Sequence, residues 1–122
     1  MPILDVECVC AEGERLPDRL AATLAEDAGR AIGAAPGHTW VRLRALPSGH
    51  YAESGGGPGA LVRPVFVELL MAALPEPAER AALAKRLCGA VAEACGRPVD
   101  NVHLLFLPAA RGRVAFGGQL RE

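Results

Sequence analysis

The chain opens with a strand-like pattern, then a helix-like one, then a second strand. In residues 2–10 (PILDVECVC) apolar side chains alternate with acidic ones, which predicts a strand. Residues 16–33 predict a helix, with Pro17 in its first turn and Gly33 at its end. The apolar stripe of that helix steps by four residues: Leu16, Leu20, Leu24, Ala28 and Ile32. Residues 38–46 (HTWVRLRAL) alternate again and predict a second strand.

The second half of the chain shows the same order of patterns. Residues 47–59 are rich in glycine and serine and predict a loop or a short hairpin. Residues 64–73 (PVFVELLMAA) are apolar enough to predict a strand buried on both faces. Residues 76–95 predict a helix whose apolar stripe again steps by four: Leu83, Leu87, Val91 and Cys95. Residues 101–108 (NVHLLFLP) predict a further strand, and 109–122 a basic turn followed by a glycine pair.

One fixed offset of 61 residues relates the two halves. It pairs Val6-Glu7 with Val67-Glu68, Leu46-Pro47 with Leu107-Pro108, and Gly56-Gly57 with Gly117-Gly118. A single offset that matches strands and a glycine turn indicates an internal repeat. We therefore expect one domain over 1–122, with pseudo-repeats 2–57 and 64–118 joined by a linker over 58–63.

Each repeat reads as a β-α-β unit, in which a helical crossover makes the two strands parallel. Two units side by side predict an α/β (α+β) protein with a four-stranded sheet and both helices on one face. The other face of the sheet lacks cover in a single chain. If that face is apolar, it needs partner chains, so we expect a homo-oligomer.

Composition narrows the class of protein. The hydrophobic fraction is 51% and the aromatic fraction only 4%, which predicts an aliphatic core. A net charge of −1 gives no electrostatic case for nucleic acid or membrane surfaces. No apolar run approaches the ~18 residues of a membrane span, and no signal-peptide pattern is present. The expected location is cytoplasmic.

The four cysteines fall into two pairs. Cys8 and Cys10 share one face of a strand, and Cys88 and Cys95 share one face of a helix. Neither pair has CxxC spacing, and no histidine cluster completes a metal site. We expect buried free thiols and neither a metal nor an organic cofactor.

Pro2 is the strongest candidate for chemistry. Methionine aminopeptidases generally remove Met1 before a small residue such as proline, and the chain would then begin with a secondary amine at the start of a strand. If Met1 is retained, the Pro2 nitrogen is an amide and cannot act as a base. An α-amino group has a pKa of about 8, and an apolar setting or a nearby arginine lowers it. An amine that is neutral near pH 7 is a suitable general base.

The whole chain resembles the tautomerase superfamily. The resemblance rests on Pro2, on the two β-α-β units, and on the glycine pair after each second strand. The second half is similar to macrophage migration inhibitory factor and malonate semialdehyde decarboxylase, through segments 85–89, 99–103 and 116–118. The first half is similar to the short 4-oxalocrotonate tautomerase (4-OT). The resemblance implies a trimer and a catalytic amino-terminal proline near a subunit boundary.

The resemblance also implies site residues. Pro2 matches the catalytic proline, and Arg42 falls where 4-OT has a strand arginine that binds a substrate carboxylate. Arg44 lies two residues on, hence on the same strand face. The other residues implied to line the pocket are Tyr51, Met71, Ala72, His103 and Phe116.

These positions imply a cofactor-independent tautomerase that acts on a small 2-oxo or enol carboxylic acid. One alternative is a hydratase, decarboxylase or dehalogenase of the same superfamily. The decarboxylase and dehalogenase members carry paired arginines after the third strand, where this chain has Leu74-Pro75-Glu76. A second alternative is a non-enzymatic trimer that retains only the fold. The physiological substrate and pathway lie beyond the sequence.

Overall fold

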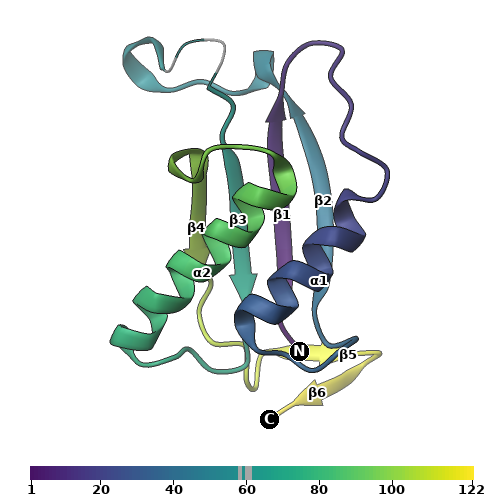
Figure 1. The fold of residues 1–122 in the computed structure, drawn as a ribbon. Helices are drawn as coiled ribbons and strands as arrows, with labels where there is room; N and C mark the ends of the chain where they lie inside the picture. Colours follow the sequence, from purple (N-terminus) through teal and green to yellow (C-terminus); the bar gives the residue numbers. More distant parts are fainter. Residues whose placement is uncertain (58, 60–61) are drawn as a thin grey trace.

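Four strands form one mixed sheet, and two helices cover one of its faces (Figure 1). The computed structural model describes residues 1–57, 59 and 62–122, so the predicted linker 58–63 lies partly outside the described residues. The sheet has the order β2-β1-β3-β4. Its strands are β1 (Ile3–Cys10), β2 (Trp40–Pro47), β3 (Val65–Leu70) and β4 (Val102–Phe106). The helices are α1 (Leu20–Ile32) and α2 (Pro77–Cys95), which confirms the predicted fold class.

Short elements fill the connections. Three 3-10 turns follow β2 and α2: η1 (Ser48–His50), η2 (Ser54–Gly56) and η3 (Val99–Asn101). Near the C-terminus, β5 (Val114–Phe116) and β6 (Gln119–Arg121) pair antiparallel, a hairpin that the sequence reading did not include. Gly117 and Gly118 form its two-residue loop with φ values of 58° and 86°. Positive φ at both positions is typical of the tight hairpin turns that match strand twist.

The 61-residue repeat is visible in the strand pairing. β1 and β2 are parallel with Leu4 opposite Val41, and β3 and β4 are parallel with Val65 opposite Val102, 61 residues later in both strands. β1 and β3 are antiparallel, with Val6 opposite Val67. Because those two residues are themselves 61 apart, a pseudo-two-fold axis passes between them. This axis relates the two ends of the sheet to one another.

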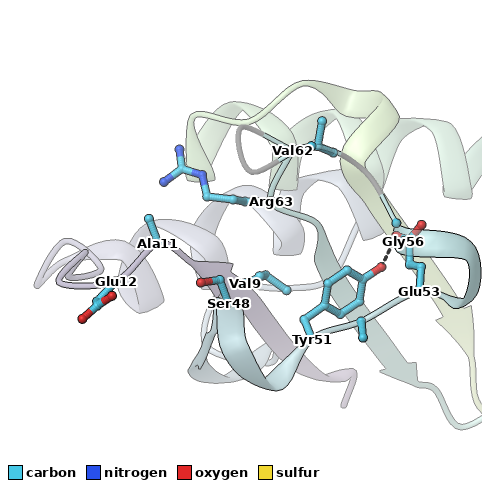
Figure 2. A pocket seen from close by; sticks show the side chains of 12 residues that line it. Val9, Ala11, Glu12, Ser48, Tyr51, Glu53, Gly56, Val62 and Arg63 are labelled. Carbon is cyan, nitrogen blue, oxygen red and sulfur yellow. Dashed lines mark hydrogen bonds between the residues drawn. The ribbon is translucent and has the colours of Figure 1, made fainter.

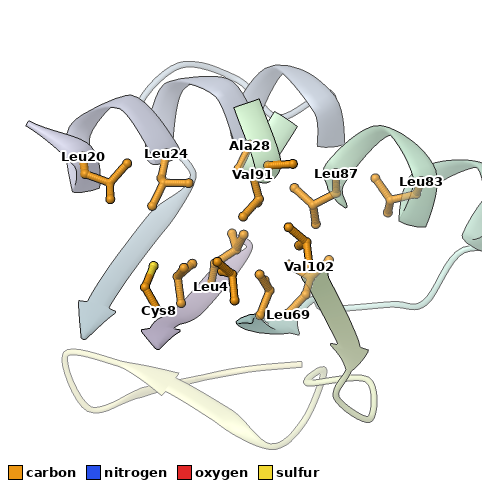
Figure 3. Close-up of a cluster of buried hydrophobic side chains, with 14 of the residues drawn as sticks. Leu4, Cys8, Leu20, Leu24, Ala28, Leu69, Leu83, Leu87, Val91 and Val102 are labelled. Atoms are coloured by element: carbon orange, nitrogen blue, oxygen red, sulfur yellow. The ribbon is translucent and has the colours of Figure 1, made fainter. Parts of the chain in front are cut away.

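The core lies between the sheet and the helices (Figure 3). Alternate residues of β1 and β3 point into it and are at most 2% exposed: Leu4, Val6, Cys8, Val65, Val67 and Leu69. The helices contribute the predicted stripes, with Leu20, Leu24 and Ala28 from α1 and Leu83, Leu87 and Val91 from α2. The core is aliphatic, as the composition predicts.

The bounds of several elements, and the burial of β3, differ from the sequence prediction. α1 begins at Leu20 instead of residue 16, because Pro17 closes a separate turn in which its carbonyl accepts from the Leu20 N–H at 3.1 Å. β3 ends at Leu70, so Met71 and Ala72 follow the strand instead of ending it. β3 is also buried on one face only, since Glu68 on its other face is exposed.

The uncovered face of the sheet carries charged as well as apolar side chains, which corrects the expectation of an apolar face. Five charged side chains alternate with the core residues of β1, β2 and β3: Asp5, Glu7, Arg42, Arg44 and Glu68. Arg42 lies opposite Asp5, and Arg44 opposite Glu7. On the same face Trp40 is 43% and Leu105 is 59% exposed, so both ion pairs and apolar contacts are available for association with other chains. No helix in the described part of the chain is long and apolar enough to cross a membrane.

Arg97 is a buried cation that joins the end of α2 to the sheet. Its side chain is 5% exposed, and its guanidinium donates to the carbonyl oxygens of Val9 at 2.9 Å and Arg63 at 2.7 Å. The carboxylate of Glu14 supplies the compensating charge, with one oxygen 3.5 Å from a terminal nitrogen of Arg97. The same carboxylate also pairs with Arg63. Burial alone would raise the pKa of Glu14, but the Ala11 N–H and both guanidinium groups outweigh it and lower that pKa.

Replacing Glu14 with Gln is expected to lower the free energy of unfolding by about 1–3 kcal/mol, because Arg97 then stays buried without a counter-charge. The folded-state pKa of Glu14 lies below its unfolded value of about 4.3. Its contribution is therefore complete above that pH and is lost as the pH falls through the folded-state pKa. Urea titrations from pH 7 downward check this.

The matched control is Glu79→Gln, which removes the exposed Glu79–Arg86 pair on α2. This change is expected to stay within about 0.5 kcal/mol of the parent chain. Equal losses for Glu14→Gln and Glu79→Gln would contradict the account of Arg97.

Candidate active site

The amino terminus lies at one end of the sheet, beside the β5–β6 hairpin (Figure 1). The carbonyl of Pro2 accepts from the Trp40 N–H at 3.0 Å, one step before the first β1–β2 pair, Ile3 opposite Trp40. This hydrogen bond fixes residue 2 at the edge of the sheet. Met1 remains 45% exposed.

Two cavities meet at this end of the molecule. One of about 340 Å³ is lined by Met1 together with Ala72, Ala110 and Arg111. The other, of about 430 Å³, is lined by Ile3, Asp5, Trp40 and Arg42, among others. Both cavities share the same apolar wall: Leu70, Val114 and Phe116. Met1 lines the first cavity and Ile3 the second, so Pro2 lies in the chain between two residues that open onto cavities with a common apolar side.

Backbone hydrogen bonds place the hairpin against the amino terminus. The chain after β4 continues alongside the end of β3, where the Leu107 N–H donates to the Leu69 carbonyl at 2.9 Å. The Ala110 N–H then donates to the Met71 carbonyl at 2.8 Å, and the Arg111 N–H to the Ala72 carbonyl at 3.1 Å. Met71 and Ala72 thus fix the position of the pocket wall through their main chain, and Ala72 also lines the cavity at Met1.

An aromatic pair closes the side of the site near β2. The rings of Trp40 and Phe116 are in edge-to-face contact, with centroids 5.3 Å apart. The guanidinium carbon of Arg121 lies 5.9 Å from the centre of the Phe116 ring, within cation–π range. Phe116 therefore lies where the resemblance implies a pocket aromatic, with Trp40 as its partner from the first repeat.

The cations of the site differ in how far they are neutralised. Arg111 and Arg121 line the cavity at Met1, along with Glu122. Among the residues that the structure describes, neither guanidinium has a carboxylate within 4.0 Å. Their charge is thus available to an anion in the cavity.

Arg42, in contrast, is held by Asp5 in a two-pronged ion pair. Its Nε donates at 2.6 Å and a terminal nitrogen at 2.8 Å to the two oxygens of the same carboxylate. The hydrogen bonds from Arg42 lower the pKa of Asp5, and burial, which acts in the opposite direction, does not offset them. A substrate carboxylate at Arg42 has to compete with Asp5. The guanidinium of Arg44 is also shared between two carboxylates. One of its terminal nitrogens lies 3.8 Å from an Asp5 oxygen, and its Nε lies 3.7 Å from a Glu7 oxygen.

Tyr51 and His103 lie toward the other end of the sheet. His103 lies opposite Phe66 in the β3–β4 pairing, and Phe66 lies opposite Glu7, five residues beyond Pro2 along β1. At about 3.3 Å per residue that is roughly 16 Å along the strand. Tyr51 contacts the same Phe66 ring at a centroid distance of 5.7 Å, and His103 contacts it at 5.4 Å.

A further cavity of about 480 Å³ lies at that end, with Tyr51, Glu53 and Arg63 in its lining (Figure 2). The Tyr51 hydroxyl donates to Glu53. The 61-residue offset relates several of its residues to the cavity at Met1: Val9 to Leu70, Ala11 to Ala72, and Val62 to Met1. Within one chain, therefore, Tyr51 and His103 lie at the pseudo-symmetric counterpart of the amino-terminal site.

The structure brings Pro2, Ala72, Phe116 and, across the second cavity, Arg42 together from the predicted set. Sequence reasoning did not single out Trp40, Arg111 or Arg121 as site residues. The basic turn at Arg111 was visible in the sequence, but its distance from Pro2 depends on the hydrogen bonds to Met71 and Ala72. Across the described residues, no group of three or more His, Cys, Asp or Glu side chains is placed to hold a metal ion.

Comparisons with known proteins find similarity in structure and not in sequence. No protein-family model and no curated protein matches the chain. Macrophage migration inhibitory factor from Oncomelania hupensis matches with 20% identity and a TM-score of 0.73, over 100% of this chain and 83% of that chain. A fused 4-OT, described as a symmetric trimer, matches with 17% identity and a TM-score of 0.76, over 98% and 94%.

Pt0534, whose structure was solved after inactivation by 2-oxo-3-pentynoate, matches with 21% identity and a TM-score of 0.71, over 98% and 94% of the two chains. At these identities the likeness shows the fold. The chain has the fold of macrophage migration inhibitory factor and 4-OT, and the tautomerase resemblance is confirmed at that level.

Proposed function

We propose that the protein is a cofactor-independent tautomerase that moves a proton within a small 2-oxo or enol carboxylic acid. The observation that carries the proposal is the cavity lined by Met1, the neighbour of Pro2 in the chain, in which an apolar wall adjoins two guanidinium groups. Among the described residues, neither group has a carboxylate within 4.0 Å. Removal of Met1 is part of the proposal, because only then does Pro2 have a free amino group.

The Pro2 nitrogen acts as the general base in this scheme. It takes a proton from the carbon next to the substrate carbonyl, and negative charge moves onto the carbonyl oxygen as an enolate. The same nitrogen returns the proton to that carbon or to a second position. An apolar wall and nearby positive charge both disfavour a cationic amine, and the cavity at residue 1 supplies both, through Leu70, Val114 and Phe116 and through two guanidinium groups.

Arg111 and Arg121 bind the substrate carboxylate in our proposal. A guanidinium offers paired N–H donors to a carboxylate, and positive charge near the carbonyl stabilises the enolate as it forms. Arg42 lies in the adjoining cavity, but its pairing with Asp5 makes it a weaker ligand than the resemblance implies.

The proposed assembly is a homotrimer, as described for the fused 4-OT. Arg44 lies at the edge of the cavity that Arg42 lines, because its guanidinium is 3.8 Å from Asp5 of that cavity. In one chain Tyr51 and His103 lie too far along the sheet to reach a substrate at Pro2. A neighbouring chain is the only source from which they can join that pocket, so their predicted roles depend on the assembly.

Replacing Arg111 or Arg121 with Gln is expected to lower kcat/KM for ketonisation of phenylenolpyruvate about tenfold each, mainly through KM, because a charge-assisted hydrogen bond is lost. The pH–rate profile is expected to move to higher pH, since the amine at Pro2 then titrates at a higher pKa. The assay follows absorbance of the enol in chains that begin at Pro2.

Arg30→Gln is the control, because Arg30 pairs with Asp27 on the exposed side of α1. It is expected to leave kcat/KM and the pH profile unchanged. If Arg42→Gln abolishes activity while the Arg111 and Arg121 variants keep it, the carboxylate is bound at Arg42 and our placement is wrong. Release of halide or carbon dioxide from suitable substrates, without isomerisation, would instead favour dehalogenase or decarboxylase chemistry.

A further inference from the structure

Two cysteines from opposite parts of the sequence meet in the core. Cys8 lies on β1 and Cys95 is the last residue of α2, and their sulfur atoms are 4.0 Å apart although 87 residues separate them in the chain. This is close to van der Waals contact. The S–S bond of a disulfide is about 2.05 Å long, so the sulfurs must approach by only about 2 Å more.

The position of Cys95 allows that approach. It is followed directly by Gly96, which ends α2 with a left-handed φ of 65°. Side chains in the last turn of a helix move more easily than those in its middle. Cys8, in contrast, is fully buried in the central strand. The movement therefore falls on Cys95, which is half-buried.

The surroundings of the two thiols shift their pKa values in opposite directions. The hydrogen bond between the two sulfur atoms and the charge of Arg97 lower the pKa of Cys95 against the effect of burial. The same hydrogen bond and burial raise the pKa of Cys8. Cys95 is thus the better nucleophile, because the thiolate is the reactive form. Burial raises the pKa of Cys88, which lies elsewhere on α2.

We propose that Cys8 and Cys95 form an intramolecular disulfide when the protein meets a hydroperoxide, with Cys95 as the thiol that attacks the peroxide and Cys8 as the resolving thiol. This site is independent of the proposed tautomerase chemistry. The closed bond joins β1, the strand that follows Pro2, to the end of α2.

The reaction balances with the hydroperoxide as oxidant. The Cys95 thiolate attacks the peroxide oxygen, so an S–O bond forms, the O–O bond breaks, and the leaving oxygen takes up a proton. The Cys8 thiol then loses its proton as its sulfur attacks the Cys95 sulfur. The S–O bond breaks and water leaves. Two thiols are oxidised by two electrons, and the peroxide is reduced.

The test treats the reduced full-length protein with stoichiometric hydrogen peroxide and then measures intact mass, free thiols and non-reduced peptide maps. We expect each chain to lose the mass of two hydrogen atoms and two of its four thiols, with one crosslinked peptide pair that contains Cys8 and Cys95. Dithiothreitol is expected to reverse the change. The oxidised chain is expected to melt at a higher temperature, because a long loop is closed.

Variants assign the two thiols. Cys95→Ser and Cys8→Ala are each expected to abolish the crosslink, whereas Cys88→Ser and Cys10→Ser are expected to keep it. The peptide map of the unaltered protein needs no variant, so the proposal stays testable if Cys8→Ala fails to fold. A disulfide between other cysteines, a bond between chains, or oxidation of Cys95 to sulfinic acid without a crosslink would each overturn it.

Discussion

A chain that keeps Met1 is expected to lose about 10²–10⁴-fold in kcat/KM relative to a chain that begins at Pro2, the range over which a positioned general base contributes. With Met1 present, the Pro2 nitrogen is an amide and cannot accept a proton. Met1 also lines the cavity of about 340 Å³ into which we place the substrate. The comparison uses phenylenolpyruvate and 2-hydroxymuconate, with intact mass to establish the first residue of each preparation.

The control for this experiment is structural. Both preparations are expected to give the same circular dichroism spectrum and the same melting temperature, because residue 1 is exposed and makes no contact with the core. A Pro2→Ala chain, which keeps a primary amine, is expected to fall between the two. Equal activity with and without Met1 would show that catalysis does not need a free amino group at Pro2, and would contradict the proposed mechanism.

Leu87→Ala is expected to cost about 2–5 kcal/mol of the free energy of unfolding, the largest effect on stability that we predict. Leu87 is fully buried on α2 between the helix and the sheet, and truncation leaves a cavity there (Figure 3). The measurement is urea denaturation at a fixed protein concentration, since association shifts apparent stability.

Leu120→Ala is the matched control, because Leu120 in β6 is 55% exposed. It is expected to change stability by no more than about 0.5 kcal/mol. A loss at Leu87 no larger than the loss at Leu120 would mean that the interface of α2 with the sheet contributes little to folding.

The fold could be predicted because its signals are local and repeated. Hydrophobic spacing located both helices and four strands, and the offset of 61 predicted the repeat that the pairs Leu4–Val41 and Val65–Val102 display. The predicted start of the first helix was wrong, because Pro17 is equally compatible with a first helical turn and with the separate turn that it forms. The β5–β6 strands are only three residues each, too short for periodicity to reveal.

The site could be predicted only in part, because it depends on contacts between distant segments. Pro2 and Phe116 were accessible through the resemblance. The pairing of Arg42 with Asp5 follows from strand register, which turns an expected substrate ligand into one side of an ion pair. The availability of Arg111 and Arg121 depends on how the C-terminal hairpin folds back, and nothing in their spacing shows it.

The most direct test of the central claim is reaction of the chain that begins at Pro2 with 2-oxo-3-pentynoate, the compound that inactivated Pt0534. This acid combines a carboxylate with a carbon that is attacked by neutral amines, so it reports the base and the anion site together without knowledge of the natural substrate. We predict one adduct per chain, mapped to Pro2 and slowed by Arg111→Gln. No adduct, or one confined to cysteine, would contradict the account.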